Sequence, residues 1–212
     1  IFELRTVPDA RTIREWVRKG TPFLAGMHRY SGFQTVRPKT RAVVVGGGFI
    51  GVETAENLIH RRFDVTLVEM GPQILAPMDP EMARIAEGYL QRHGLHLVLN
   101  DGVAGFEPGE NGTVRVLTKS GAAHTADLVI LALGVRPVVT LARAAGLEIG
   151  ARGGIRVDEQ MRTSQPDIFA VGDAVEVKDP VTGEWGLVAL AGPANRQGRI
   201  AADVIVGRDS RF

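Results

Sequence analysis

Apolar residues recur at helical spacing in five stretches of the sequence. In the first stretch Ile13, Trp16 and Val17 form one apolar stripe, which follows Asp9 and ends before Gly20. Aspartate often caps a helix N-terminus and glycine often follows the last turn, so we expect Asp9 to cap a helix over 9–19. The same reasoning predicts helices over 50–61, 80–93, 141–145 and 193–205.

Short apolar runs rich in β-branched residues separate these helices and predict buried strands. Two segments of alternating apolar and polar residues, separated by turn formers over 108–112, predict an antiparallel hairpin or meander. Residues 20–40 carry glycines and prolines without a periodic pattern, which is typical of a linker. The buried strands are predicted over 42–45, 64–69, 95–99, 126–133, 155–157 and 167–171, and the meander over 102–107 and 113–119.

A strand, a glycine turn, a helix and a second strand follow one another over 42–69, which is the order of a βαβ unit. Helices and strands are mixed along the rest of the chain. We therefore predict an α/β fold, with a Rossmann-like βαβ nucleotide-binding domain and an antiparallel β-meander. The main domain is expected over 37–140, and the segments before and after it are expected to belong to a different part of the protein.

The composition narrows the function by exclusion. There are 25 Lys and Arg against 24 Asp and Glu, and the net charge of +1 gives no reason to expect a nucleic-acid partner. The most apolar run, over 128–135, is far shorter than the roughly 18 residues of a membrane-spanning helix. The sequence has no cysteine, its histidines are scattered, and no serine lies in a G-x-S-x-G motif, so neither a metal site nor a covalent nucleophile is predicted.

The clearest chemistry lies in the turn after the first strand of the βαβ unit, where Gly46, Gly48 and Gly51 form a G-x-G-x-x-G motif. Gly46 permits a sharp turn, Gly48 lets the backbone approach a pyrophosphate, and Gly51 lets the helix pack close to the sheet. The N-terminus of the following helix offers free N–H groups and the positive end of its dipole to phosphates. The alternative is a tight turn whose glycines serve only the turn itself.

Glu69 ends the second strand of this unit, at the position where an acidic residue accepts the adenosine ribose hydroxyls of a dinucleotide. Its carboxylate would repel a 2′-phosphate, and Met70, Gly71 and Pro72 supply no arginine to bind one. We therefore expect NAD(H) to be preferred over NADP(H); the alternative for Glu69 is a solvated charge at a strand end. Glu53 lies in the first turn of the helix, where the dipole favours a carboxylate whatever its role.

Four segments carry further motifs: VVVGGGFIGVE over 43–53, GVRP over 134–137, TSQPDIFAVGDA over 163–174 and LAGPANRQGR over 190–199. In this order they resemble the FAD-dependent pyridine nucleotide-disulfide oxidoreductases, and the match covers nearly the whole chain. The first two are similar to the motifs that begin and close the nicotinamide domain of that family, and the third to its second flavin motif. The last resembles the branch that contains CoA-disulfide reductases, NADH oxidases and NADH peroxidases.

The resemblance implies a role for each matching residue. Glu53 would lie near the nicotinamide, Glu69 would bind the adenosine ribose, and Gly134 would contact the bound nucleotide. Asp173 would bind a ribityl hydroxyl of FAD, and the helix that begins near Pro193 would direct its N-terminus toward the isoalloxazine. The residues implied for NAD(H) are Gly46, Gly48, Phe49, Ile50, Gly51, Glu53, Glu69 and Gly134, and those implied for FAD are Gly172, Asp173, Leu190 and Ala191.

The resemblance also implies how the chain is organised. Residues 1–36 would be the end of an N-terminal FAD-domain segment and a linker, 37–140 the NAD(H)-binding domain, and 141–212 the C-terminal half of the FAD-binding domain. The family's first flavin motif and its redox cysteine have no counterpart here, so no catalytic residue is assigned and the chain is expected to be the middle of a longer protein. Alone, it is expected to be inactive and to bind FAD weakly or not at all.

In the longer protein the resemblance implies hydride transfer from NADH to FAD and onward to a disulfide, CoA-disulfide, oxygen or peroxide acceptor. A cytoplasmic homodimer without a membrane partner is expected. One alternative is a non-catalytic NAD(H)-binding module or redox sensor. Another is an NAD-dependent dehydrogenase without flavin, which the second flavin motif and the segment over 190–199 disfavour.

Overall fold

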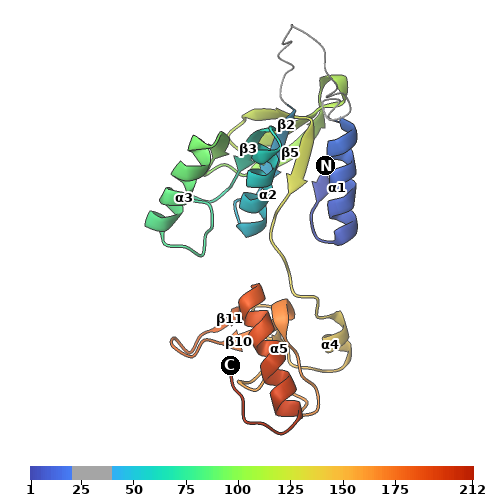
Figure 1. Ribbon diagram of the computed structural model, residues 1–212, viewed down its shortest axis with the longest axis vertical. Coiled ribbons are helices and arrows are strands. Elements are labelled where there is room, and N and C mark those ends of the chain that lie inside the picture. The colour runs from blue at the N-terminus through green and yellow to red at the C-terminus, as the bar shows by residue number, and fades with distance from the viewer. Residues whose placement is uncertain (21–39) are drawn as a thin grey trace, which may run out of the picture. The chain divides into compact units, whose positions relative to one another are not determined.

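The computed structural model describes residues 1–20 and 40–212, which form two compact units, Ile1–Gly134 and Val135–Phe212 (Figure 1). The predicted linker over 20–40 lies almost entirely outside the described residues. In the first unit parallel strands form a sheet in the order β1-β8-β2-β3-β4, and the predicted α/β fold is confirmed. This sheet consists of β1 (Phe2–Glu3), β2 (Arg41–Val45), β3 (Asp64–Val68), β4 (Leu95–Val98) and β8 (Leu128–Leu131).

Helices cover one face of this sheet, and a small antiparallel sheet covers the other. Alternate residues of a strand point to opposite faces, so Ala42 and Val44 of β2 join the core beneath the helices. Val43 and Val45 join the core beneath the antiparallel strands. All four are buried, which explains why β2 is a continuous apolar run. The helices are α1 (Val7–Gly20), α2 (Phe49–His60) and α3 (Pro80–Arg92), seen beside the sheet in Figure 1.

The antiparallel sheet is the expected meander, with one strand more than predicted. The strand predicted over 126–133 is confirmed as β8 (Leu128–Leu131), but its predicted start is wrong, because Ala126 belongs to the antiparallel sheet and the chain changes sheet at Asp127. The Asp127 carboxylate accepts a hydrogen bond from the Arg41 N–H at 2.8 Å, so residues after this point align with β2. The meander consists of β5 (Val103–Pro108), β6 (Val114–Thr118) and β7 (Ala123–Ala126), with the 3-10 turn η1 (Glu110–Gly112) after β5.

The N-terminal residues pack on the first unit, which differs from the predicted domain boundaries. β1 extends the parallel sheet by pairing with β8. Ile13, Trp16 and Val17 of α1 contact the core beneath the helices, and the Phe2 and Trp16 rings meet edge to face with centroids 6.2 Å apart. A strand as short as β1 gives no detectable sequence pattern, so the first residues look like part of a flank. The boundary with the second unit falls after Gly134 rather than after residue 140.

The capping residue of α1 is Thr6, so the prediction of Asp9 as the cap is wrong. The Asp9 N–H donates to Thr6 Oγ1 at 3.3 Å. In return the Asp9 carboxylate accepts hydrogen bonds from the N–H groups of Thr6 at 2.7 Å and Arg5 at 3.1 Å. This reciprocal arrangement is a capping box. The hydrogen bonds from Thr6, and then that from Arg5, lower the pKa of the Asp9 carboxyl.

The second unit is built on one long helix and a small sheet in the order β11-β10-β9. Val175 and Val177 of the central strand form one core with Ile200 and Val204 of the helix. No helix within residues 1–20 and 40–212, in either unit, has the length and hydropathy needed to cross a membrane. The elements are α4 (Thr140–Ala144), β9 (Ile155–Arg156), the 3-10 turn η2 (Gly172–Ala174), β10 (Val175–Lys178), β11 (Trp185–Leu187) and α5 (Ala191–Ile205).

The predicted strand over 167–171 is wrong. In the part of the chain that the structure describes, this segment makes a single β-bridge, between Phe169 and Arg162, and no named strand pairs with it. Its backbone pairs only with the nearby residues 161–163, through hydrogen bonds from the Thr163 N–H to the Ile168 carbonyl and from the Ala170 N–H to the Met161 carbonyl, and this short pairing does not extend into a strand ladder. Ile168 and Val171 of this segment are each 40% exposed. Sequence patterns also miss β10 and β11, which pair with each other.

Candidate functional site

The turn from β2 into α2 contains the glycine motif, and the protein's own backbone requires two of its glycines. Gly46 has φ +104°, in the left-handed region, and a Cβ atom on it would collide with the carbonyl oxygen of Ala132. A Cβ atom on Gly51 would collide with the carbonyl oxygen of Gly46. The first turn of α2 is therefore in backbone contact with the end of β2.

Gly48 is required neither by strain nor by packing. Its φ of −73° suits any residue, and a Cβ atom on it would meet no described protein atom within 4 Å. Gly48 is also the N-cap residue of α2. Because it has no side chain, it offers no acceptor to the N–H groups in the first turn of the helix. The turn thus leaves open space beside free N–H donors, where the helix dipole favours a negative charge.

Three further predicted residues lie on the exposed side of the first turns of α2. Phe49 is 51% and Ile50 is 37% exposed, although both are large apolar residues. Glu53 is exposed and makes no ion pair with any residue that the structure describes. These side chains are therefore free to contact a molecule bound at the helix N-terminus.

Glu69 reaches back to the glycine turn from the end of β3. Its Oε2 accepts a hydrogen bond from the Gly47 N–H at 2.6 Å, and its Oε1 accepts one from the Gly71 N–H at 2.7 Å. Glu69 is therefore not a freely solvated charge, because its half-buried carboxylate fixes two backbone turns. A carboxylate oxygen has two lone pairs, so each oxygen retains one acceptor position.

The segment after β3 closes over the other side of the glycine turn. The Leu75 N–H donates to the Gly47 carbonyl at 2.8 Å, and the Ile74 side chain is fully buried. A Cβ atom on Gly47 would lie 3.0 Å from Ile74 and 3.2 Å from Glu69. The Ile74 N–H in turn donates to the Glu87 carboxylate of α3 at 3.1 Å. Backbone and side chain together hold the glycine turn in one conformation.

Gly134 lies at the end of the first unit, shortly beyond Ala132. The Ala132 N–H donates to the Val45 carbonyl at 2.8 Å, so this segment begins beside the glycine turn. Gly134 has φ +86°, and a Cβ atom on it would meet no described atom within 4 Å. The residues predicted for NAD(H) therefore lie at or just beyond the carboxyl ends of β2, β3 and β8, the edge at which parallel α/β sheets bind ligands.

A hydrogen-bond network that sequence reasoning missed supports Glu69 from the meander. The Asp101 N–H donates to the Glu69 carbonyl at 3.2 Å, and the Asp101 carboxylate accepts from Ser120 Oγ at 2.6 Å and from the Ser120 N–H at 3.0 Å. Hydrogen bonds from Ser120 and then Thr118 hold the pKa of the Asp101 carboxyl below its usual value, against the opposing effect of burial. Asp101 and Ser120 are distant in sequence, so no local pattern reveals the pair.

The residues predicted for FAD lie around the start of α5 in the second unit. Gly172 has φ +81°, and its N–H donates to Oε1 of the buried Gln197 on α5 at 2.7 Å. Asp173 follows in η2 and is exposed. Leu190 is the N-cap residue of α5 and Ala191 is its first residue; both are exposed, and no side chain caps this helix end. Gln197 lies within the segment over 190–199, but sequence reasoning gives it no role.

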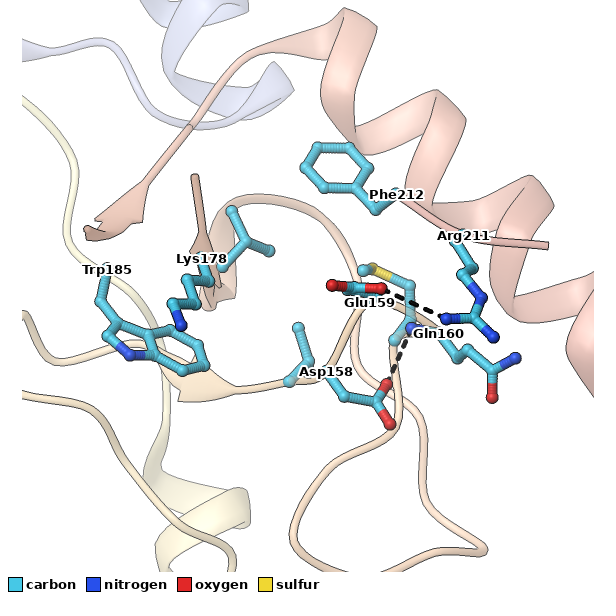
Figure 2. A pocket seen from close by; sticks show the side chains of 10 residues that line it. Asp158, Glu159, Gln160, Lys178, Trp185, Arg211 and Phe212 are labelled. Carbon is cyan, nitrogen blue, oxygen red and sulfur yellow. Dashed lines mark hydrogen bonds and ion pairs between the residues drawn. The ribbon is translucent and has the colours of Figure 1, made fainter. Parts of the chain in front are cut away.

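Elsewhere in the second unit a hollow of about 390 Å³ shares no residue with either predicted site (Figure 2). Arg211 lies 3.6 Å from the Glu159 carboxylate, and the Asp158 carboxylate accepts a hydrogen bond from the Gln160 N–H at 2.8 Å. None of the residues predicted for NAD(H) or FAD lines this hollow. In either unit, no group of three or more His, Asp or Glu side chains from residues 1–20 and 40–212 is arranged to hold a metal ion. The hollow is lined by Val157, Asp158, Glu159, Gln160, Met161, Val177, Lys178, Trp185, Arg211 and Phe212.

Comparison with known proteins gives a family and a curated relative. Residues 2–198 match the sequence model of the family described as pyridine nucleotide-disulphide oxidoreductase. An NADH oxidase from Methanocaldococcus jannaschii is 38% identical over 213 aligned positions, which cover 100% of this chain and 43% of that protein. The chain therefore spans less than half the length of this relative.

Two solved structures are similar to the chain in both fold and sequence. The reduced CoADR-RHD of Bacillus anthracis has a TM-score of 0.85 and 44% identity, over 100% of this chain and 34% of that one. A NAD-dependent persulfide reductase from A. fulgidus has a TM-score of 0.85 and 34% identity, over 100% of this chain and 36% of that one. Both similarities extend over the two units described above.

The same substitution should have different effects at Gly51, which packs against backbone, and at Gly48, which faces open space. Gly51→Ala places a methyl group against the Gly46 carbonyl, and we expect it to lower the free energy of unfolding by about 1–3 kcal/mol. For Gly48→Ala we expect a change below about 0.5 kcal/mol, since a poorer N-cap is offset by a less flexible unfolded chain. Urea denaturation followed by Trp16 fluorescence in a Trp185→Phe background measures both. Equal losses would contradict the packing argument.

The lowered pKa of Asp101 predicts a loss of stability in acid. Such a carboxyl contributes stability that is fully present above its unfolded pKa, near about 3.9, and is lost as the pH falls through the folded value. Asp101→Asn removes this titration, so the free energy of unfolding should fall less steeply between about pH 5 and pH 2 than in the unchanged chain. Paired urea denaturation series measure the slopes. Identical slopes would show that Asp101 has no special partner in the folded state.

Proposed function

Because the chain belongs to the pyridine nucleotide-disulphide oxidoreductase family, as its motifs predict and the matches above confirm, we propose that it forms the NAD(H)-binding part of a flavoprotein oxidoreductase. The first unit would bind the dinucleotide, and the second would supply the C-terminal half of a FAD-binding domain. Since the chain spans less than half of its relatives, the complete reaction is proposed for a protein with further segments.

The observation that carries this proposal is the open space at Gly48, at the uncapped N-terminus of α2 and next in the chain to Gly47, whose N–H is bound by the Glu69 carboxylate. A pyrophosphate requires N–H donors in a positive field, and the first turn of α2 offers both. Ribose hydroxyls require acceptors, and the remaining lone pairs of Glu69 supply them. Donors and acceptors occur in the order that the pyrophosphate and adenosine ribose of a dinucleotide require.

Glu69 also supports a preference for NAD(H) over NADP(H). Its carboxylate is fixed by the N–H groups of Gly47 and Gly71, so it cannot turn away from a 2′-phosphate without leaving a donor unpaired. A 2′-phosphate on a ribose bound by Glu69 would bring two negative charges close together, and these charges would repel each other. The neighbouring Met70 and Pro72 add no positive charge that would offset the repulsion.

The nicotinamide end of the dinucleotide would extend along the first turns of α2. Phe49 and Ile50 offer exposed apolar surface to the ring, and Glu53 offers an acceptor for its carboxamide. The open backbone at Gly134 would leave room for the nucleotide at the end of β8. When bound, the nicotinamide supplies a hydride that FAD accepts, and the protein's part is to orient the two rings and exclude water.

For FAD we propose Gly172, Asp173, Leu190 and Ala191. The Asp173 carboxylate would accept a hydrogen bond from a ribityl hydroxyl, since it is exposed within the 3-10 turn η2, which packs on α5. The uncapped N-terminus of α5 would stabilise negative charge on the isoalloxazine. Gln197 would position Asp173 by fixing the Gly172 turn through its 2.7 Å hydrogen bond.

The final electron acceptor is proposed to be a disulfide, a CoA-disulfide, oxygen or peroxide. The relatives named above include both an NADH oxidase and a persulfide reductase, so proteins with different activities share the fold of this chain. We therefore propose that segments outside this chain select the acceptor. The complete protein is proposed to be a cytoplasmic homodimer.

Titration with NADH tests the dinucleotide site. We expect the chain to bind NADH, and Gly48→Ala to weaken binding at least about tenfold, or ~1.4 kcal/mol, because the methyl group occupies the space proposed for the pyrophosphate. Gly192→Ala is a matched control, since it also adds a methyl group in open space at a helix N-terminus. Calorimetry or nicotinamide fluorescence measures the affinities. Unchanged affinity of Gly48→Ala would place NADH elsewhere.

The chain alone is expected to retain little FAD and to show no NADH oxidation, because the second unit offers contacts to only part of that cofactor. Incubation with FAD, desalting and measurement of the visible flavin absorbance test this expectation. Stoichiometric flavin on the desalted chain would contradict it. Tight NADH binding by the complete protein without flavin or turnover would instead favour the non-catalytic module.

A further inference from the structure

Lys119 lies just beyond the end of β6, close to the residue that follows Glu69. Its N–H donates to the Gly102 carbonyl at 2.8 Å, which fixes the backbone of residue 119 against residue 102. A Cβ atom on Gly102 would lie 3.4 Å from Lys119 Cε and 3.3 Å from Met70 Cβ. The lysine side chain and Met70 therefore both lie close to the same position beside Gly102, which has no side chain to separate them.

The position of Lys119 is tied to that of Glu69 by hydrogen bonds. The next residue, Ser120, donates from both its N–H and its Oγ to the Asp101 carboxylate, and the Asp101 N–H donates to the Glu69 carbonyl. Thr118 Oγ1 also lies 3.1 Å from Ser120 Oγ. The turn that carries Lys119 is thus anchored to the proposed ribose-binding residue rather than being a free surface loop.

The Lys119 ammonium has no partner in the part of the chain that the structure describes. It is exposed and makes no ion pair, although a lysine side chain has four rotatable methylene groups and three donors to offer. Met70 is 75% exposed and has a flexible, unbranched side chain. Both the Lys119 ammonium and the Met70 side chain are therefore accessible to a ligand.

We propose that Lys119 binds the 2′-phosphate of NADP(H) when that cofactor occupies the dinucleotide site. The inference rests on the proposed function, since it uses Glu69 as the ribose-binding residue. A phosphate on the ribose O2′ would lie beyond Glu69, on the side of Met70 and Lys119. The Glu69 carboxylate repels that phosphate and the Lys119 ammonium attracts it, so the chain would favour NAD(H) but still accept NADP(H).

The opposing charges predict a selective effect of removing one of them. Lys119→Gln should weaken 2′-phospho-ADP-ribose about fivefold while leaving ADP-ribose within about twofold, because an exposed charge pair contributes modestly and only one ligand carries the extra phosphate. Lys119→Arg should restore most of the lost affinity, since it retains the charge. The fivefold difference should shrink as salt is raised, because salt screens exposed charges.

Isothermal titration of the full chain with these two ligands measures the effect. Lys178→Gln is the matched control, because it removes a lysine charge from the other unit. Circular dichroism and urea denaturation show whether Lys119→Gln remains folded. Equal weakening of both ligands would mean that Lys119 meets the pyrophosphate or adenine, and no weakening of either would mean that it meets no part of the cofactor; either result overturns the inference. Failure of the unchanged chain to bind either ligand would overturn the proposed function itself.

Discussion

The close approach of the first turn of α2 to the end of β2 governs the rest of the first unit. It is possible because Gly51 has no side chain to collide with the Gly46 carbonyl, and because Gly46 adopts a left-handed conformation against Ala132. The approach turns the free N–H groups of α2 toward the carboxyl edge of the parallel sheet. That edge is where the ends of β3 and β8 also lie, so the donors of α2 share it with Glu69 and the residues before Gly134.

Glu69 connects this turn to the remainder of the site. Its carboxylate holds the N–H groups of Gly47 and Gly71, and its carbonyl accepts from Asp101, which in turn holds Ser120 beside Lys119. One residue thus has a structural and a proposed binding role at the same time. Because both roles use the same carboxylate, a change made to alter cofactor preference also changes the glycine turn. In the proposed site, selectivity arises from two opposite charges, the Glu69 carboxylate that repels a 2′-phosphate and the Lys119 ammonium that attracts it.

Features that depend on residues close together in the sequence can be predicted from it, whereas features that depend on contacts between distant residues cannot. The glycine motif, the helices and the buried strand β2 depend on neighbouring residues, and their patterns are visible in the sequence. The segment over 167–171 has the residues of a strand but lacks a strand neighbour among the described residues, and β1 is too short to leave a pattern. Hydrogen bonds such as Asp101 to Ser120 and Gly172 to Gln197 join distant residues, so only the folded chain reveals them.

A crystal structure of the chain with NADH tests the proposed dinucleotide site most directly. We expect the pyrophosphate within hydrogen-bond distance of the backbone N–H groups in the first turn of α2, over Gly48. We also expect an adenosine ribose hydroxyl on a Glu69 oxygen that still accepts from Gly47 or Gly71. A dinucleotide bound away from this turn, or a ribose that makes no contact with Glu69, would show that the site is assigned wrongly.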